Sequence, residues 1–337
     1  MALPTRPLGS TGLDVTVLGL GAWAIGGSAS QGGWGPQDDA ESVAAIHRAV
    51  ELGINWIDTA PAYGFGHAEH VVGEALAALP EDERPLVFTK CGLVWEEGET
   101  TVRNVLAQDS IRRECEASLR RLKVERLDLL QIHWPAHDGT PPEESWQTMA
   151  ELVEEGKTRA VGVSNYDVEL LERCEAVRHV DSYQPELNLI ARDAEDGIAW
   201  CRANGTGVIV YSPMRSGLLT GTSTAERWAT LPDDDWRRGH PDFQEPALSR
   251  NLALVEQFRT IAQELDASVA ELAVAWTLRC AGVSGAIVGA RRPEQVEGWI
   301  SAASLELDEE LFDRIGAVLE ETGAGSGPVR PSVGSVR

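Results

Sequence analysis

Three short apolar runs in the sequence each end in an ionisable residue, and a tyrosine follows the first of them. These four residues are Asp58, Tyr63, Lys90 and His133. Taken singly, each has an ordinary structural explanation, as a capping carboxylate, a packed phenol, an exposed strand end or a hydrogen-bonded core histidine. Their coincidence at the ends of consecutive runs is harder to explain in this way, and it indicates one shared catalytic site.

The four residue types together suit the reduction of a carbonyl group. Hydride delivery to the carbonyl carbon leaves an oxyanion that must be protonated, and a tyrosine with an ordinary pKa of about 10 is a reluctant proton donor near neutrality. We expect the Lys90 ammonium to lower the pKa of Tyr63, and Asp58 to pair with that ammonium. His133 would orient the carbonyl and stabilise the charge that develops on its oxygen.

Apolar strand candidates alternate with segments of helical period, which predicts a parallel sheet. The strand candidates are residues 15–20, 54–57, 86–89, 127–132, 160–163, 182–184, 207–211 and 285–288. The helical candidates are residues 37–52, 67–79, 108–122, 143–155, 167–177, 193–203, 247–280, 293–302 and 308–321. Eight strands close a (β/α)8 TIM barrel, whose catalytic side chains project from the carboxyl ends of the strands. An open, doubly wound sheet is the competing architecture.

Several segments lie outside this repeat. A glycine turn within the first twenty residues predicts a short N-terminal hairpin, and the last two helices are additions at the C-terminus. Segment 213–246 has no clear periodicity and is typical of a lid or binding loop, which we expect Trp228 and Trp236 to anchor. We predict one barrel domain over residues 1–322 and a disordered tail over residues 323–337, which are rich in Gly, Ser and Pro.

The stretch Gly19–Ala24 matches G-x-G-x-x-A after a strand, which is the pattern of a dinucleotide-binding turn. Such a turn opens a helix directly and is followed by an acidic residue about twenty residues later. Here the glycines continue into IGGSASQGGWG, which no helix tolerates. We therefore interpret the stretch as a glycine-rich loop at the active site.

The net charge of −24 and the isoelectric point near 4.6 argue against nucleic acid and anionic membranes as partners. The five cysteines are widely spaced and include no C-x-x-C pair, which predicts reduced thiols in a cytoplasmic protein and no metal site. We find neither a signal peptide nor an apolar run of the ~18 residues that a membrane span needs. The predicted partner is a small carbonyl, alcohol or sugar substrate.

The motifs also carry a family resemblance. The stretches GINWIDTAPAYG, LVFTKCG, LDLLQIHWP, VGVSNY and YSPMRSGLLTG, in this order, resemble the aldo-keto reductase superfamily, and the similarity extends from about residue 5 to residue 320. The resemblance implies a (β/α)8 barrel that binds NAD(P)H without a Rossmann domain. It also implies that Asp58, Tyr63, Lys90 and His133 form the catalytic tetrad, with Tyr63 as the general acid/base.

The resemblance further implies a set of cofactor contacts. Ser164, Asn165 and Gln184 would hydrogen-bond the nicotinamide carboxamide, and Tyr211 would stack on the nicotinamide ring. The residues implied along the pyrophosphate path are Ser212, Met214, Gly217 and Leu218. Those implied at the adenosine-phosphate end, within IVGARRPEQVEGW, are Gly289, Arg291 and Gln295.

An arginine at the adenosine end favours NADPH over NADH, because a planar and permanently charged guanidinium matches the ribose 2′-phosphate. NADH stays possible, since this chain departs from its relatives at two places. Thr222 stands where many relatives have the lysine of GLLTGK, and Gly298 and Trp299 replace an acid and an amide expected to read the adenine. A missing lysine removes a cationic contact to the pyrophosphate.

Aromatic residues gather after the strand ends and predict an aromatic substrate pocket. Its predicted residues are Trp23, Phe65, Trp95 and Trp134, with Trp34 as a further candidate. Such a cup accommodates aryl aldehydes and also stacks on sugar rings, so neither the substrate nor the reaction direction follows from the sequence, and nor does the oligomeric state. The alternative to an oxidoreductase is a subunit that binds NADPH to sense redox state. The complete tetrad favours the enzyme.

Overall fold

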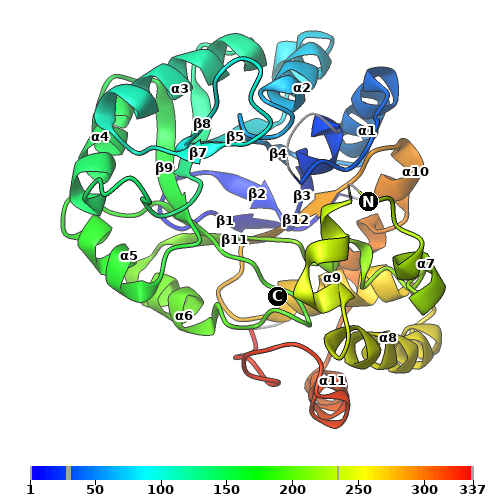
Figure 1. Ribbon diagram of the computed structural model, residues 1–337. Coiled ribbons are helices and arrows are strands. Elements are labelled where there is room, and N and C mark those ends of the chain that lie inside the picture. The colour runs from blue at the N-terminus through cyan, green and yellow to red at the C-terminus, as the bar shows by residue number, and fades with distance from the viewer. Residues whose placement is uncertain (1, 28–31, 234, 335–337) are drawn as a thin grey trace.

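The computed structural model describes residues 2–27, 32–233 and 235–334 (Figure 1). Eight parallel strands form a closed barrel in the order β10-β11-β12-β3-β4-β5-β8-β9. They are β3 (Leu18–Gly21), β4 (Trp56–Asp58), β5 (Leu86–Cys91), β8 (Leu127–Ile132), β9 (Thr158–Ser164), β10 (Ser182–Gln184), β11 (Gly207–Tyr211) and β12 (Gly285–Gly289). The predicted (β/α)8 barrel is confirmed, and the alternative of an open, doubly wound sheet is wrong.

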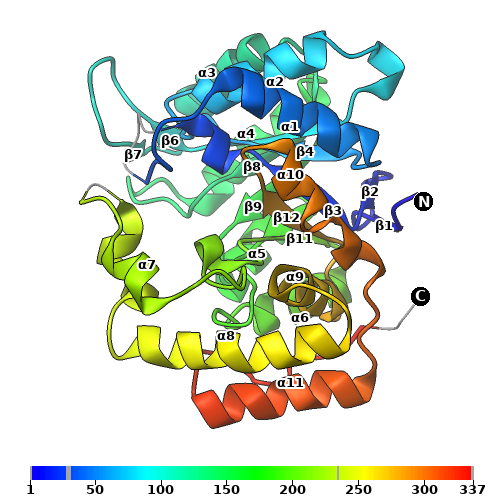
Figure 2. The same cartoon turned by 90° about the vertical axis from the view of Figure 1, so that its right-hand side faces the viewer.

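Helices surround the barrel (Figure 1). They are α1 (Asp39–Glu51), α2 (His67–Ala77), α3 (Gln108–Leu122), α4 (Pro142–Glu154), α5 (Val168–Glu175), α6 (Glu195–Asn204), α7 (Ala225–Ala229), α8 (Ala247–Glu264), α9 (Val269–Arg279), α10 (Pro293–Glu297) and α11 (Glu309–Thr322). The predicted helix over 247–280 is two helices, because Asp266 has φ 52° and Ser268 starts α9 with a capping box to Glu271. Helix α11 lies beside α8 (Figure 2).

Short 3₁₀ helices occupy parts of the loops. They are η1 (Trp23–Gly26), η2 (Glu81–Glu83), η3 (Arg215–Gly217), η4 (Trp236–Gly239), η5 (Pro241–Phe243) and η6 (Ile300–Ser304). The stretch Gly19–Ala24 ends β3 and begins η1, a single short turn. It therefore opens no long helix of the kind that a dinucleotide-binding turn needs, which agrees with the loop interpretation.

The interior of the barrel is packed with side chains from most of its strands, together with residues of the N-terminal hairpin. Trp56 and Phe88 are both fully buried, and their ring centroids are 5.2 Å apart. Trp56 fits only because its neighbour on β3 is Gly19, where a Cβ atom would come within 2.2 Å of the indole. The closed ring and this filled interior leave the strand ends as the place where polar side chains can gather.

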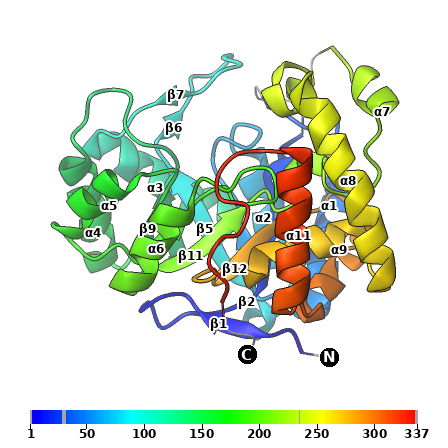
Figure 3. The same cartoon turned by 90° about the horizontal axis from the view of Figure 1, so that it is seen from below.

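A hairpin closes one end of the barrel, as the sequence predicts (Figure 3). Its strands are β1 (Thr5–Pro7) and β2 (Asp14–Thr16), which pair antiparallel. Leu8, Leu13 and Val15 belong to the same buried cluster as Trp56 in the barrel interior. The predicted strand 15–20 is thus divided, because its first residues belong to this hairpin and its remainder to β3.

The opposite end of the barrel carries two elements that the sequence pattern did not predict. One is a second antiparallel hairpin, β6 (Leu93–Val94) with β7 (Arg103–Asn104), and the other is the short helix α7. Figures 2 and 3 show β6, β7 and α7 at the same end of the molecule, away from β1 and β2. These additions surround the carboxyl ends of the barrel strands.

Residues 323–334 do not form the free tail that their composition predicts. Ala324 is 1% exposed, and the Ser326 amide donates to the Ile190 carbonyl at 2.9 Å. The segment supplies carbonyl acceptors to the buried guanidinium of Arg192, so a sequence without large apolar residues is still held in place. Residues 335–337 of the predicted tail lie outside the described residues.

Candidate active site

The four predicted catalytic residues lie together at the ends of β4, β5 and β8. Lys90 Nζ donates to Asp58 Oδ1 at 2.5 Å and to the Tyr63 hydroxyl at 3.4 Å. The Tyr63 ring stands edge-on to the His133 imidazole, with ring centroids 5.8 Å apart. Three consecutive strand ends and one loop therefore converge on a single cluster.

Burial makes this cluster depend on its hydrogen bonds. Lys90 is 1% exposed, so its ammonium needs acceptors, which Asp58 and the Thr59 carbonyl at 3.1 Å provide. The second carboxylate oxygen of Asp58 accepts a hydrogen bond from Gln184 Nε2 at 2.8 Å. The loop that carries Tyr63 approaches the first loop so closely that a Cβ atom at Gly64 would lie 2.1 Å from the Gly26 carbonyl oxygen.

The same burial sets the protonation of the cluster at neutral pH. Burial raises the pKa of Tyr63 above its usual value; Lys90 lowers it, as expected, but burial is the stronger influence. Burial disfavours the charged form of Lys90, but Asp58 and Tyr63 together raise the pKa of Lys90. Burial, aided by Lys90, lowers the pKa of His133 well below its usual range. Tyr63 is thus a protonated phenol and His133 a neutral imidazole.

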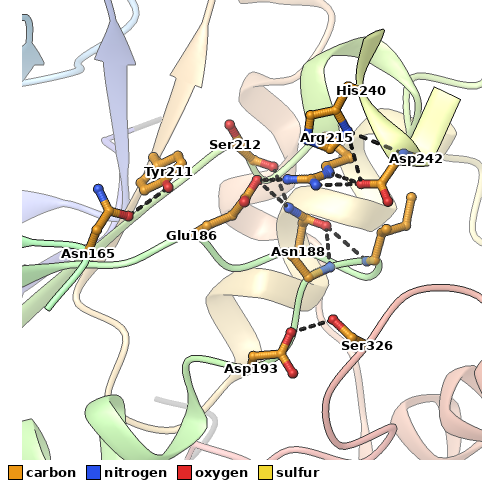
Figure 4. A network of polar contacts seen from close by, with 12 residues as sticks. Asn165, Glu186, Asn188, Asp193, Tyr211, Ser212, Arg215, His240, Asp242 and Ser326 are labelled. Atoms are coloured by element: carbon orange, nitrogen blue, oxygen red, sulfur yellow. Dashed lines mark hydrogen bonds and ion pairs between the residues drawn. The ribbon is translucent and has the colours of Figure 1, made fainter. Parts of the chain in front are cut away.

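A second polar group lies beside the cluster, at the ends of β9, β10 and β11. Ser164 Oγ donates to the Gln184 carbonyl at 2.7 Å, and Asn165 Nδ2 donates to the His133 carbonyl at 3.0 Å. The Tyr211 hydroxyl donates to Asn165 Oδ1 at 2.8 Å (Figure 4). Gln184, for which the family resemblance implies a contact to the nicotinamide carboxamide, also lines the cavity, and its Nε2 donates to Asp58.

The segment after β11 holds an unusual backbone. Ser212, Arg215 and Ser216 have φ values of 56°, 44° and 51°, in the left-handed region that residues other than glycine rarely adopt. Arg215 holds the segment, since its guanidinium lies between the carboxylates of Glu186 and Asp242 (Figure 4). Strained residues of this kind are typical of ligand sites.

The catalytic cluster and the second polar group beside it open into one cavity of about 710 Å³, within the range of small-ligand sites. Its polar and aromatic lining comprises Trp23, Trp34, Asp58, Tyr63, His133, Trp134, Ser164, Asn165, Gln184, Tyr211, Ser212, Ser216, Thr220, Arg227, Trp236, Arg237, Arg291 and Gln295. Met214, Gly217 and Gly289 also line it. Of the predicted cofactor residues, only Leu218 is absent from the lining, and it is fully buried.

Aromatic rings form a wall of this cavity. The Trp23 ring centroid lies 5.3 Å from that of Trp34, 5.4 Å from that of Trp236 and 6.3 Å from that of Tyr63. Trp134 is 41% exposed and also lines the cavity. The wall therefore joins the first loop to the segment that contains η4.

Phe65 and Trp95, predicted for the substrate pocket, pack against each other at 5.4 Å and are not among the lining residues. In the long segment, Trp228 is buried against Phe243 at 4.7 Å, as an anchor should be. Trp236 does more than anchor, because it lines the cavity.

Comparison with known proteins decides the family. The family model described as "Aldo/keto reductase family" matches residues 17–320. This chain belongs to the aldo/keto reductase family. It is an NAD(P)H-dependent oxidoreductase that interconverts carbonyls and alcohols.

Individual relatives of this aldo-keto reductase agree in length and in fold. The aldo-keto reductase YhdN of Bacillus subtilis is 36% identical over 96% of this chain and 95% of its own. The NADH-specific methylglyoxal reductase of Escherichia coli is 35% identical over 90% of this chain and 94% of its own. The solved glycerol dehydrogenase AKR11B4 of Gluconobacter oxydans is 38% identical over 97% and 98%, with a TM-score of 0.87.

The cavity of this aldo-keto reductase fits a dinucleotide by its donor chemistry. Three arginines line it, and the carboxylate among its lining residues, Asp58, is already paired with Lys90. Among the described residues, no group of three or more His, Cys, Asp or Glu residues is arranged to hold a metal ion. The arginines and the hydroxyls would hold the phosphates and the ribose, and Ser164, Asn165 and Tyr211 would meet the nicotinamide beside Tyr63.

The part of the cavity where the sequence predicts the adenosine end of the cofactor differs from the simplest expectation. Arg291 lines the cavity, but its guanidinium also donates to the Trp34 carbonyl at 2.9 Å, to the Pro36 carbonyl and to Gln37. It therefore ties the first loop to the end of β12. Trp299 is 2% exposed and does not line the cavity.

Sequence reasoning missed three cavity residues that carry charge or apolar surface from irregular segments. Arg227 and Arg237 come from the long segment, and Val102 comes from the loop between β6 and β7. The weak signal was the density of arginine within TAERWATLPDDDWRRG in an otherwise acidic chain. Nothing in its periodicity indicated which of these arginines face the cavity.

Proposed function

We propose that the enzyme reduces small aldehydes and ketones with Tyr63 as the proton donor. When bound, a reduced nicotinamide supplies the hydride. Tyr63 carries the observation that supports this role: its hydroxyl is at the cavity wall, protonated, and 3.4 Å from the Lys90 ammonium. His133 presents a neutral imidazole beside it, which suits a hydrogen bond to the carbonyl oxygen.

Lys90 and Asp58 are proposed to work on Tyr63 rather than on the substrate. The ammonium stabilises the phenolate that remains after the proton has left, and Asp58 fixes the ammonium at 2.5 Å. Gln184 in turn fixes Asp58 at 2.8 Å. The charge pair is shielded from water, and its members act on the pKa of Tyr63 in opposite directions, since Lys90 lowers it and Asp58 raises it.

The proposed substrates are short carbonyl compounds with an apolar or hydroxylated flank. Aromatic and aliphatic side chains (Trp23, Trp34, Trp134 and Val102) line the cavity together with Tyr63 and His133. The relatives named for methylglyoxal and glycerol point to three-carbon substrates, and indole faces also pack on sugar rings. Methylglyoxal, glyceraldehyde and dihydroxyacetone are therefore the first compounds to test.

The proposed cofactor preference is for NADPH, with NADH as a second cofactor. Arg291 supports it, because it is a permanent cation at the adenosine end of the cavity and a guanidinium has five N–H donors. The NADH-specific relative argues for testing both cofactors. Dissociation constants of the two, measured side by side, check the preference.

A cytoplasmic location without a nucleic-acid partner is also proposed. The five cysteines are all free and buried, as suits a reducing compartment, and the net charge of −24 repels polyanions. None of the helices in the described part of the chain is long and apolar enough to cross a bilayer.

The proton-donor role is tested by Tyr63→Phe, which removes the hydroxyl and keeps the ring. We expect kcat for carbonyl reduction to fall by a factor of about 100 or more, because proton transfer is lost. The dissociation constant of NADPH, followed by tryptophan fluorescence, should stay near the wild-type value. Undiminished reduction by this variant would show that another group supplies the proton. Tight NADPH binding by the wild-type protein without turnover on any carbonyl or alcohol would contradict the proposed function as a whole.

A further inference from the structure

Arginines give the cavity lining positive charge, whereas the molecule as a whole is strongly negative. The chain carries a net charge of −24, yet Arg227, Arg237 and Arg291 all line the cavity. The carboxylate that lines it, Asp58, is paired with Lys90. Among the residues that the structure describes, these three cations face no unpaired carboxylate in the cavity lining, so they form a candidate anion site. The contacts of each arginine show which of them can meet the anion.

Arg237 is already neutralised. Its Nε and Nη2 atoms donate to the two carboxylate oxygens of Asp235 at 2.9 and 2.6 Å. The guanidinium lies over Trp34 at 4.9 Å and over Trp228 at 5.6 Å from the ring centroids. It therefore joins the two loops that border the cavity and carries little net charge toward a ligand.

Arg291 has no carboxylate partner among the described residues, but most of its N–H donors are already used in hydrogen bonds within the protein. Each of its three nitrogens donates a hydrogen bond to the segment Trp34–Gln37. Two of its five N–H groups remain for a ligand. Arg291 can thus meet one phosphate at its own end of the cavity, beside Gln295.

Arg227 is the cation with the greatest unused capacity. It lies on α7 with its guanidinium over Trp228 at 5.3 Å, and its one hydrogen bond goes to the Thr222 hydroxyl. No carboxylate pairs with it among the residues that the structure describes. Four of its five donors are therefore available to an anion in the cavity.

A chain of hydroxyl groups links Arg227 to the middle of the cavity. The Thr222 hydroxyl lies 3.0 Å from the Thr220 hydroxyl, which donates to the Gly217 carbonyl at 2.8 Å. Thr220 and Gly217 line the cavity on the segment that follows Tyr211. The neighbouring Ser216 carbonyl accepts from Arg237, whose guanidinium lies over Trp34, and the Trp34 carbonyl accepts from Arg291, so contacts connect this segment to both ends. In a dinucleotide the two phosphates of the bridge lie between the bases, so this middle section must receive the pyrophosphate.

We propose that Arg227 binds the pyrophosphate bridge of the dinucleotide. The cation comes from a helix outside the barrel repeat and takes the place of the lysine that Thr222 replaces. The inference rests on the proposed function, because it assumes that NAD(P)H occupies this cavity. It separates two tasks: Arg227 supports NADH and NADPH equally, while Arg291 discriminates between them.

The test measures binding by titration calorimetry, with ADP-ribose, NADH and NADPH as separate ligands. The variant is Arg227→Gln, which keeps a donor for Thr222 but removes the charge. We expect it to weaken all three ligands by the same factor of about ten, and to reduce the dependence of binding on salt. Arg291→Ala should weaken NADPH more than NADH or ADP-ribose, because the last two lack the 2′-phosphate.

Two controls exclude less specific explanations. Arg113→Ala removes an equal charge from an exposed position on α3 outside the cavity, and it should leave binding unchanged. Thr222→Lys in the Arg227→Gln background should recover most of the lost affinity, since it restores a cation from the other side. Such recovery is not expected if Arg227 merely stabilises α7.

The outcomes distinguish a failure of the proposed function from a failure of the Arg227 assignment alone. If wild-type protein binds none of the three ligands, the proposed function fails and the inference with it. If wild-type protein binds them and Arg227→Gln binds equally well, only the inference is overturned. A loss confined to NADPH would place Arg227 at the 2′-phosphate and would likewise overturn it.

Discussion

At the scale of single residues, the Tyr63 phenol lies under two opposing influences. Burial raises its pKa, while the Lys90 ammonium lowers it, and burial is the stronger of the two. The phenol is therefore fully protonated at neutral pH, which is the form that donates a proton in carbonyl reduction. The reverse reaction needs the phenolate, which is scarce until the pH is high.

These protonation states predict opposite pH profiles for the two directions. We expect kcat for reduction to stay level from about pH 7 to about pH 9, because the reactive acid form persists up to a pKa above the ordinary 10. His133 adds no step there, since its pKa is lowered well below its usual range. The rate of alcohol oxidation should rise about tenfold for each pH unit over the same interval. Steady-state rates at constant ionic strength check both profiles.

Lys90→Met serves as the companion variant for these profiles. Without the ammonium, which lowers the pKa of Tyr63, that pKa should rise further, and this lowers the rate of oxidation at a fixed pH. Circular dichroism shows whether the variant, which leaves Asp58 unpaired, is still folded. A reduction profile that falls with a midpoint near neutrality would contradict the assignment of Tyr63 as the acid.

At the scale of elements, one arginine joins the strained segment after β11 to the segment that contains η4 and η5. Arg215 is 13% exposed and contacts Glu186 beside β10 and Asp242 in η5 (Figure 4). Asn188 adds a hydrogen bond to the Ser212 carbonyl at 3.1 Å. The position of Trp236 at the cavity therefore depends on an ion pair that lies outside the cavity.

We expect Arg215→Met to loosen residues 218–246, because it leaves two carboxylates facing each other with little access to water. Loss of a largely buried partner costs about 3 kcal/mol, so limited proteolysis in this segment should become at least about tenfold faster. NADPH should also bind more weakly. Arg238→Met is the matched control, since Arg238 lies in the same segment but pairs with the fully exposed Asp233. Equal protease resistance of both variants would refute the role of Arg215.

Elements also show how far the sequence could lead. The apolar runs that end in Asp58, Lys90 and His133 are predictable, because parallel strands are buried on both faces and stand out as continuous apolar stretches. The hairpin of β6 and β7 and the helix α7 are short and exposed, so they have no such pattern. Arg227 on α7 and Trp236 in η4 reach the cavity from a segment without a periodic sequence pattern. In such a segment only tertiary contacts fix the direction of a side chain.

At the scale of the whole molecule, both terminal segments pack against the barrel domain far from their own neighbours in sequence. The N-terminal hairpin fills one end, and the described part of the C-terminal segment packs beside β10 and α6. Composition could not reveal the second contact, because it depends largely on backbone carbonyls, with Ala324 and Val329 as the apolar side chains that meet the core. Gly325 shows how close the approach is, since a Cβ atom there would lie 2.0 Å from the Ile190 carbonyl oxygen.

The C-terminal segment should therefore contribute to the stability of the whole barrel. Arg192 is 2% exposed, and its guanidinium donates to the carbonyls of Pro328, Ala324 and Gly327 at 3.0, 3.2 and 3.3 Å. Removal of residues 323–337 strips these acceptors from a buried cation, and hydrogen bonds to charged groups are worth about 1.5–3 kcal/mol each. We expect the truncated chain to melt about 5 °C or more below the full chain. Arg192→Met removes the buried charge, so the same truncation in that background should lower Tm by much less. Calorimetry of the four proteins measures this coupling, and equal losses of Tm with and without Arg192 would show that the segment stabilises the barrel by other contacts.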